Sequence, residues 1–445
     1  MILSLVFVFI VIVWIVIGTS TLKLHPFLVL LIGGVLLGFL LGLDPFSIFQ
    51  TLLNGFGGTM KSIGFLILFG TLIGTSLQHS GGANALANGV LRYLHKLPLP
   101  IAISCIGYLV SIPVFCDAAF VILAQLNKSL AQKTKTSFVG LSVALSTGLF
   151  APHVLIPPTP GPLAAAANLD LANLFPLIIT GAIIGLILIL TGGLFALYIS
   201  KLYPYKEVDL EEPILEPKED KTLPSFKQAI LPILLPLLLM CLGALIPKSA
   251  LTTQQLELVQ VLSNPITALA IGALFGIRFL LPMGSKSISL SFSKGVKQAF
   301  PILIITGMGG ALGKVIGEIP LREHLESLSG LESFGLLIPF LIAALLKTGQ
   351  GSSTVAIITA ASIIFPLLPL IGLESEMGKV WVIMAIGTGA MTVSHANDSY
   401  FWIVSQMSGM DVKTAYRTHT LGTLIQGTLG IVLVFIGFYL WKIIF

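Results

Sequence analysis

The chain has 445 residues, of which 55% are hydrophobic and only 10% are charged, and its mean hydropathy is +1.00. A water-soluble protein of this length could not cover so much apolar surface, so the composition excludes that class. The formal net charge of +5 requires no nucleic-acid partner, because Lys and Arg normally accumulate in the cytoplasmic loops of membrane proteins. The composition therefore predicts an all-α polytopic membrane protein.

Apolar runs follow one another along the whole chain and reach the roughly 20 residues that a helix needs to cross a bilayer. The first run, 1–18, lacks a basic n-region and a small-residue cleavage site, so we interpret it as a retained span rather than a signal peptide. Cys105, Cys116 and Cys241 lie in apolar stretches without CxxC spacing, which favours packed thiols over a metal site or a disulfide.

One segment, 203–224, breaks this apolar pattern near the middle of the chain. It contains seven acidic residues and several prolines, a composition typical of a flexible, water-exposed linker. We interpret it as an acidic cytoplasmic linker between an N-terminal membrane repeat, 1–202, and a C-terminal membrane repeat, 225–445.

The two halves match each other at an offset of about 240 residues. Identical residues recur in the same order: Gly55 and Gly295, Gly70 and Gly310, Thr147 and Thr388, Gly148 and Gly389, and Asp170 and Asp411. Each identity is weak alone, but together and in order they indicate an internal duplication.

Charges beside two equivalent apolar stretches, 99–131 and 335–371, predict the orientation of the two halves. The flanks of the first stretch contain five basic residues and no acid, whereas the flanks of the second contain mostly glutamates. Because basic flanks stay in the cytoplasm, the stretches should open to opposite sides, as in inverted repeats. Both flanks of each stretch share one side, so each stretch is predicted to be a re-entrant hairpin, with five full spans in each repeat.

Two further segments, 137–168 and 379–407, have interrupted helical patterns. The first is interrupted by a Pro-rich run at 152–162, and the second by a polar run at 394–399. Irregular backbone within a membrane is tolerated only where protein or a wet cavity satisfies its polar groups. The sequence therefore predicts one broken helix in each repeat.

Three ionisable residues in these elements are candidates for proton coupling. Asp117 lies at the tip of the first hairpin, and His395 and Asp398 lie in the second broken helix. A charge at membrane depth costs several kcal/mol unless it is paired or hydrated, and burial can move a pKa toward the working pH. The alternatives are that Asp117 only caps a helix and that His395 only bonds across helices.

The tip of the second hairpin is predicted to bind substrate. Gln350, Ser352, Ser353 and Thr354 open its returning half, where a helix N-terminus would direct free amide N–H groups at mid-membrane. Lys347 adds a cation, and the set suits a carboxylate. The alternative is ordinary Ser and Thr capping beside a lysine that extends outward to the interface.

Polar residues of the broken helices complete the candidate substrate site. His153 lies in the first broken helix and Asn397 in the second. The Pro-rich run around Thr159 cannot form a regular helix, so it leaves carbonyl groups free for a ligand or an ion.

The chain resembles the gluconate permease family over nearly its whole length. The matching motifs are LHPF at 24–27, GGT at 57–59, SGGA at 80–83, FCDAAF at 115–120, HVLIPPTPGP at 153–162, GSSTVA at 351–356 and SHANDSYFW at 394–402. Members of this family are sugar-acid–proton symporters, and their relatives carry D-serine and small hydroxy acids. The resemblance implies proton-coupled uptake of a small organic acid across a bacterial inner membrane, by an elevator-like or rocking exchange around the broken elements.

Three positions depart from the family pattern. Thr159 replaces a second His, Lys347 replaces an Arg, and Tyr400 replaces a Gly. Thr159 cannot titrate near neutral pH, Lys347 lacks the bidentate geometry of Arg, and Tyr400 would narrow the pocket. All three remain candidate substrate-binding residues, and the substrate is expected to be smaller than gluconate or differently substituted.

Sodium-coupled transport, an enzyme and a channel are the alternatives to proton-coupled transport. Sodium coupling, of an organic acid or of a D-serine-like amino acid, stays open because unwound carbonyls with Asp and Asn side chains also suit Na⁺. An enzyme is disfavoured because the chain has no HExxH, GxGD or GxSxG motif, and a channel would need a continuous wet pore. We expect no cofactor and no metal site. The expected partners are a small carboxylate, a coupling proton or sodium ion and the lipid bilayer, and a homo-oligomer is left open.

Overall fold

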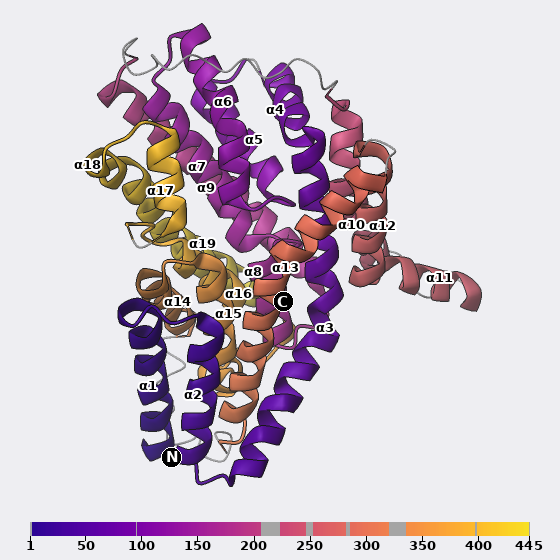
Figure 1. Ribbon diagram of the computed structural model, residues 1–445, viewed down its shortest axis with the longest axis vertical. Coiled ribbons are helices and arrows are strands. Elements are labelled where there is room, and N and C mark those ends of the chain that lie inside the picture. The colour runs from indigo at the N-terminus through magenta and orange to yellow at the C-terminus, as the bar shows by residue number, and fades with distance from the viewer. Residues whose placement is uncertain are drawn as a thin grey trace.

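The computed structural model describes residues 2–94, 96–205, 223–245, 252–281, 285–319, 335–396 and 398–444. All regular secondary structure in these residues is helical, which confirms the all-α class (Figure 1). Most of the acidic segment 203–224 lies outside the described residues, as do the flank of the second hairpin at 320–334 and the side chain of Cys241.

The helices form two sets in chain order, one in each half of the chain. The first half contains α1 (Ile2–Val16), α2 (Pro26–Leu40), α3 (Pro45–Ser80), α4 (Gly82–Tyr93), α5 (Leu99–Ser111), α6 (Cys116–Thr134), α7 (Phe138–Leu155), α8 (Pro160–Asn168) and α9 (Leu174–Leu202). The second half contains α10 (Phe226–Leu245), α11 (Thr253–Ser263), α12 (Pro265–Leu280), α13 (Ser285–Ile316), α14 (Leu337–Gln350), α15 (Ser353–Ile364), α16 (Glu376–Met391), α17 (Ser399–Met407), α18 (Val412–Ala415) and α19 (Leu421–Ile444). Two short 3₁₀ helices, η6 (Phe365–Leu367) and η7 (Pro369–Ile371), follow α15. A π-helical turn, η1 (Ile17–Thr21), follows α1, and a second one, η8 (Tyr416–Thr420), precedes α19.

Several of these helices are long and apolar enough to cross a membrane. By length and composition, the described part has four such helical stretches: Phe138–Asn168 (α7 with α8), Leu174–Leu202 (α9), Ile288–Ile316 (within α13) and Val412–Ile444 (α18, η8 and α19). Two bent pairs would each add a span: Pro45–Lys61 with Gly64–Ser80, bent by 45°, and Thr253–Ser263 with Pro265–Leu280, bent by 64°. The chain is therefore a multi-pass membrane protein.

Each predicted hairpin is a pair of consecutive helices joined by a short turn. The turn between α5 and α6 spans 112–115, and the turn between α14 and α15 consists of Gly351 and Ser352. Gly351 has φ +71, a left-handed conformation in which a side chain would be strained, so glycine permits this sharp turn. The first hairpin lies in the upper half of Figure 1 and the second in the lower half.

Both predicted broken helices are present, with one correction. The second break separates α16 from α17 at 392–398, close to the predicted polar run. The first break, 156–159, is shorter than the predicted interruption at 152–162. Pro160 opens α8, because a proline at the first helical position needs no N–H partner and already has a helical φ. The prediction of irregular backbone from Pro160 onward is therefore wrong.

Two groups of contacts show in which direction α9 runs. At one end, the Ala172 amide donates to Glu376 Oε2 at 2.9 Å, and Lys379 Nζ donates to the Asp170 carbonyl at 2.7 Å. At the other end, the segments 137–139, 202–205 and 408–411 surround one cavity, together with Thr414. Helix α9 thus runs from the first end to the second, whereas α19 starts near the second end.

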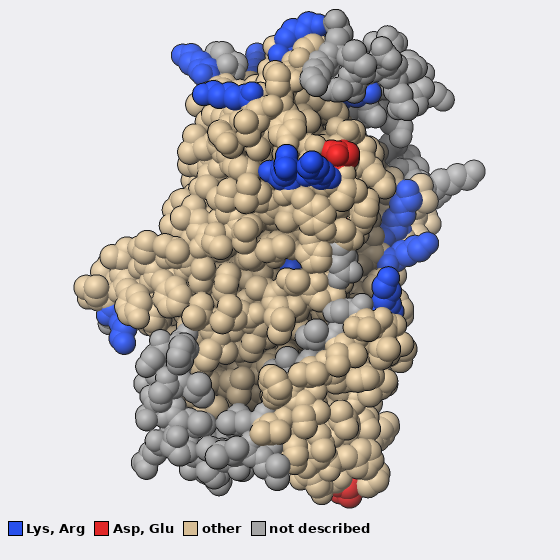
Figure 2. All heavy atoms as spheres, turned by 90° about the vertical axis from the view of Figure 1, so that its left-hand side faces the viewer, with Lys and Arg blue, Asp and Glu red and all other residues tan. Residues whose placement is uncertain are grey.

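The long helices α3 and α13 pack against each other beside the broken helices (Figure 1). Close approach requires small residues there: a Cβ on Gly55 would lie 2.7 Å from the backbone of Ala311. On the face shown in Figure 2, most Lys and Arg side chains gather in the upper half, and large areas below carry only uncharged residues. An uncharged surface of this kind suits contact with lipid.

Candidate functional site

A small cavity lies where the two hairpin turns and the second break meet. Its volume is about 70 Å³, and its lining consists of Phe115, Cys116, Asp117, His153, Ser352, Ser353, Thr354, Asp398, Ser399 and Tyr400. Seven of these ten residues were candidates from the sequence: Asp117, His153, Ser352, Ser353, Thr354, Asp398 and Tyr400. The fold thus brings together predicted site residues from both halves of the chain.

Three helices begin at this cavity. Cys116 opens α6, Ser353 opens α15 and Ser399 opens α17, and all three residues are in the lining. The first amide groups of a helix have no partner within the helix, and its N-terminus carries a partial positive charge. Three such ends around one cavity favour the binding of an anion.

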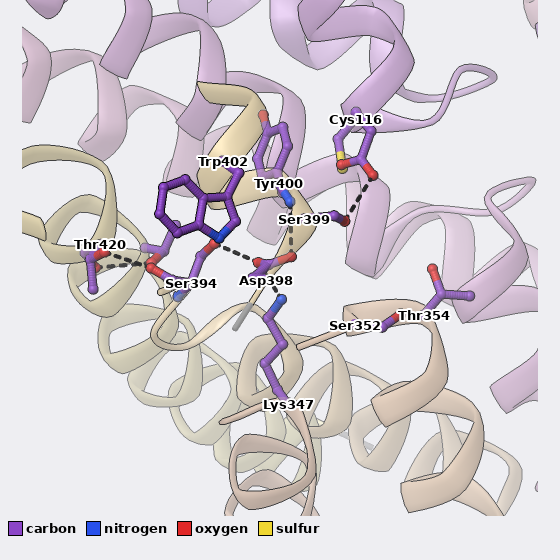
Figure 3. A network of polar contacts seen from close by, with 12 residues as sticks. Cys116, Lys347, Ser352, Thr354, Ser394, Asp398, Ser399, Tyr400, Trp402 and Thr420 are labelled. Atoms are coloured by element: carbon purple, nitrogen blue, oxygen red, sulfur yellow. Dashed lines mark hydrogen bonds and ion pairs between the residues drawn. The ribbon is translucent and has the colours of Figure 1, made fainter. Parts of the chain in front are cut away.

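The centre of the polar network is an ion pair. Lys347, near the end of α14, points at Asp398, and its Nζ lies 2.5 Å from Asp398 Oδ2 (Figure 3). Both side chains are buried, with exposed fractions of 1% for Lys347 and 5% for Asp398. The ammonium group also lies 5.6 Å from the centre of the Phe150 ring. The predicted alternative, a Lys347 that extends outward, is not what the structure has.

Asp398 accepts two further hydrogen bonds. The Ser394 hydroxyl donates to Oδ2 at 2.5 Å, and the Tyr400 amide donates to Oδ1 at 3.0 Å as the N-cap bond of α17. The carboxylate of Asp398 is therefore both the partner of Lys347 and the cap of a helix that begins at the cavity.

The backbone before Asp398 is held by the start of α19 and the turn that precedes it. Thr420 Oγ1 donates to the Ser394 carbonyl at 2.6 Å, and Thr423 Oγ1 accepts from the Ser394 amide at 3.0 Å. Val393 has φ +59, a conformation that a β-branched residue rarely adopts and that costs on the order of 1–3 kcal/mol. Strain of this kind is common at functional sites, where the surrounding structure maintains it.

Two polar contacts cross the cavity between the halves of the chain. Ser399, labelled in Figure 3, donates from Oγ to Asp117 Oδ2 at 3.4 Å. Thr354 Oγ1 lies 3.5 Å from His153 Nε2. Both are long, so they hold the two sides together weakly. A ligand with hydrogen-bonding groups would compete for them directly.

Some buried polar atoms near the cavity have no hydrogen-bond partner among the described residues. They are His153 Nδ1 and both amide atoms of Gln350. Leaving a buried polar atom unpaired costs about 1–3 kcal/mol. Gln350 and His153 therefore have capacity left for a ligand or for water.

Five of the twelve predicted site residues are not among the described residues of the cavity lining: Lys347 and Gln350, described above, and three that are placed differently. Thr159 is buried, but its hydroxyl donates to the Ile156 carbonyl of its own turn at 2.5 Å, and it does not line the cavity. His395 is half-buried in the second break and is also outside the lining. Asn397 lies outside the described residues.

Sequence reasoning missed His419. This residue is fully buried, with Nδ1 3.2 Å from Ser146 Oγ and Nε2 3.1 Å from Ser394 Oγ. It lies just before the apolar run 421–443, where an ionisable residue is easily taken for part of a water-exposed flank. The signal was present, because an ionisable residue within a membrane segment is by default a functional candidate.

No group of three or more His, Cys, Asp or Glu side chains is placed to hold a metal ion in the part of the chain that the structure describes. The carboxylates of the site contact an ammonium group, hydroxyl groups and a backbone amide.

Comparison with known proteins identifies the family. The GntP family permease model matches residues 3–440. An uncharacterized permease of Haemophilus influenzae is 35% identical over 92% of this chain and 86% of its own length. The D-serine transporter DsdX of Escherichia coli is 31% identical over 94% of this chain and 95% of its own. A gluconate permease of Pseudomonas aeruginosa is 30% identical over 93% and 92%.

Solved structures share the fold at low sequence identity. The YdaH transporter of Alcanivorax borkumensis has a TM-score of 0.61 and 16% identity, and the alignment covers 88% of each chain. MtrF of Neisseria gonorrhoeae, from a class of antimetabolite efflux pumps, has a TM-score of 0.60 and 14% identity, with 86% of this chain and 83% of MtrF covered. The chain therefore belongs to the GntP family of permeases, and it is a membrane transporter rather than an enzyme.

Proposed function

We propose that this permease takes up a small organic acid across the bacterial inner membrane together with protons. The observation that carries the proposal is the buried Lys347–Asp398 pair, whose carboxylate side lines a cavity at which three helices begin. A buried cation next to a cavity at which helices begin favours a carboxylate, and Asp398 is the carboxylate that is now paired with it.

The pair gives a physical reason for coupling. A substrate carboxylate that binds Lys347 must displace Asp398, and an unpaired buried carboxylate is costly. A proton on Asp398 removes that cost, so substrate and proton bind together more favourably than either alone. Asp117, which lines the same cavity, and His395 are the further candidates for the coupled proton.

The size of the cavity favours a small substrate. Its volume of about 70 Å³ is well below the roughly 300–1,000 Å³ of pockets for drug-sized ligands. Tyr400 limits it on one side, packed against the rings of Phe120 and Phe150 at 6.2 and 5.3 Å between centres. These contacts support an acid smaller than a six-carbon sugar acid.

A D-amino acid is the second candidate, and sodium is the alternative coupling ion. The chain is similar to the D-serine transporter DsdX, and Asp117 offers a second carboxylate in the cavity that Asp398, the partner of Lys347, also lines. An amino acid could place its carboxylate at Lys347 and its ammonium group at Asp117. Carbonyl groups of the break at 392–398 would suit sodium.

A ligand panel tests the substrate class. The melting temperature of the purified protein is measured with D-glycerate, D-lactate, gluconate and D-serine in wild type and in Asp117→Asn. The proposal predicts stabilisation by a small hydroxy acid in both proteins. Stabilisation by D-serine alone, and its loss in Asp117→Asn, would instead support the amino-acid candidate.

We also propose that the halves 1–202 and 225–445 are inverted repeats with one re-entrant hairpin each, joined by a cytoplasmic linker at 203–224. Two equivalent glycines support the repeat. Gly148 of α7 packs on Ser104 of α5, and Gly389 of α16 packs on Phe340 of α14. In each half, the first helix of the hairpin thus packs against the broken helix at an equivalent glycine.

Cysteine labelling tests the orientation. Lys133 and Glu374 are exposed beside the first and second hairpin. In a background without the three native cysteines, Lys133→Cys should react only from the cytoplasm and Glu374→Cys only from outside. Reaction of both from one face would contradict inversion.

A further inference from the structure

We propose that His419 and Asp398 share one proton through the hydroxyl of Ser394, so that His419 is a positioning residue that sets when the Lys347–Asp398 pair opens. This inference rests on the proton coupling proposed above. It concerns a residue that is buried behind the cavity and absent from its lining.

His419 connects the two halves of the chain. It lies in the π-helical turn η8, and such turns are frequent at functional sites. Its ring bridges Ser146 of α7, at 3.2 Å, and Ser394 of the second break, at 3.1 Å, and its edge meets the Tyr400 ring at 5.3 Å between centres. Ser394 in turn contacts Asp398 at 2.5 Å, so an unbroken series of hydrogen bonds joins the imidazole to the ion pair.

The hydroxyl protons restrict the state of the ring. Ser394 has one hydroxyl proton and donates it to the ionised Asp398, so its oxygen must accept from His419 Nε2–H. On the other side, the Ser146 hydroxyl can donate either to His419 Nδ1 or to the Val143 carbonyl, 3.1 Å away. His419 can therefore gain a proton at Nδ1 without leaving any hydrogen bond unmade.

The same contacts allow one proton to pass to Asp398. In the protonated ring, Nε2–H gives its proton to Ser394 Oγ while Ser394 gives its own proton to Asp398 Oδ2. The products are a neutral imidazole with its proton on Nδ1, an intact serine hydroxyl and a neutral aspartic acid. One proton is thereby moved from His419 to Asp398 in two coupled transfers that leave both groups neutral, and the neutral acid no longer holds Lys347 as an ion pair.

The surroundings of His419 contain few other charges. The turn η8 packs against α7, α17, α18 and α19. Asp398 and Lys347 are the charged groups whose fields act on the buried ring, and Tyr400 is the titratable group against it. Arg417 on the same turn and Lys413 on α18 are exposed. The proton affinity of His419 is thus tied to the state of the Lys347–Asp398 pair.

Infrared difference spectroscopy tests the inference without any substrate. The protein in lipid vesicles is titrated with acid, and the carboxylic acid C=O band of Asp398 is identified by its loss in Asp398→Asn. In His419→Gln, which can still form hydrogen bonds but cannot titrate, the pH midpoint of this band should move by about one unit or more, as expected for sites that titrate as a pair. Ser394→Ala removes the connecting hydroxyl and also a direct hydrogen bond to Asp398, so its midpoint should move whether or not His419 is coupled, and His419→Gln is the deciding variant.

Thr420→Val is the matched control. Thr420 holds the Ser394 carbonyl from the same turn but carries no titrating proton, so the midpoint should stay at its wild-type value. A midpoint in His419→Gln equal to that of the wild type and of the control would overturn the inference and leave His419 as a cross-link between the halves. If the midpoint shifts are present but a pH gradient does not drive uptake by the wild type, the proposed proton coupling is wrong and the link between His419 and Asp398 stands.

Discussion

The Lys347–Asp398 pair allows a quantitative test of the site. Removing one partner of a buried ion pair costs about 3–5 kcal/mol, because the other charge stays buried and unpaired. After Lys347→Met, Asp398 keeps the Ser394 hydroxyl and the Tyr400 amide, so the cost should lie near the lower value. After Asp398→Asn, the ammonium group loses its counter-charge and keeps at most a neutral amide oxygen and the Phe150 ring at 5.6 Å, so the cost should lie near the upper value.

The assay is a double-mutant cycle on the free energy of unfolding in detergent. The variant with both substitutions leaves no unpaired charge, so it should be more stable than the sum of the single changes predicts, by about 1–3 kcal/mol. It should nevertheless fail to transport, because neither the cation for the substrate nor the carboxylate for the proton remains. A coupling energy below about 0.5 kcal/mol would refute the reasoning, since the two groups would then be independent.

Two further predictions concern the hairpins. Ser353→Ala and Thr354→Ala should each weaken binding of the carried acid by about 1 kcal/mol or more, measured by calorimetry, and unchanged affinity in both would make the start of α15 only a helix cap. Gly148→Ala should lower the melting temperature, because its Cβ would lie 2.5 Å from the Ser104 carbonyl oxygen, and overpacking costs about 1–3 kcal/mol. Gly57→Ala is the control, since nothing lies within 4 Å of its added Cβ, and equal melting temperatures would contradict the close packing of α5 on α7.

The sequence predicted the all-α class and the places where helices are interrupted. Pro and polar residues within apolar runs marked these interruptions, because backbone groups within a membrane must be satisfied by helix or by protein. The re-entrant course of the hairpins and the inversion of the repeats stay predictions. The first break was predicted too wide, since Pro160 was counted as a helix breaker although it opens α8.

The sequence predicted most residues of the site but not which of them contact each other. Intramembrane charge alone marked Lys347 and Asp398, yet nothing in the sequence shows that they form a pair across 51 residues. Thr159 was expected at the site because of its Pro-rich context, but its hydroxyl bonds within its own turn. His419 itself was recognisable as an ionisable residue next to an apolar run, but its contact with Ser146, 273 residues away, leaves no local pattern in the sequence.

Gradient-driven transport tests the central claim most directly. Proteoliposomes are loaded with potassium buffer, and uptake of labelled D-glycerate is followed under an imposed pH gradient, acidic outside, or under a sodium gradient at equal pH. Proton coupling predicts accumulation with the pH gradient alone, lost in Asp398→Asn, and no response to sodium. Accumulation driven by sodium and insensitive to the pH gradient would contradict it.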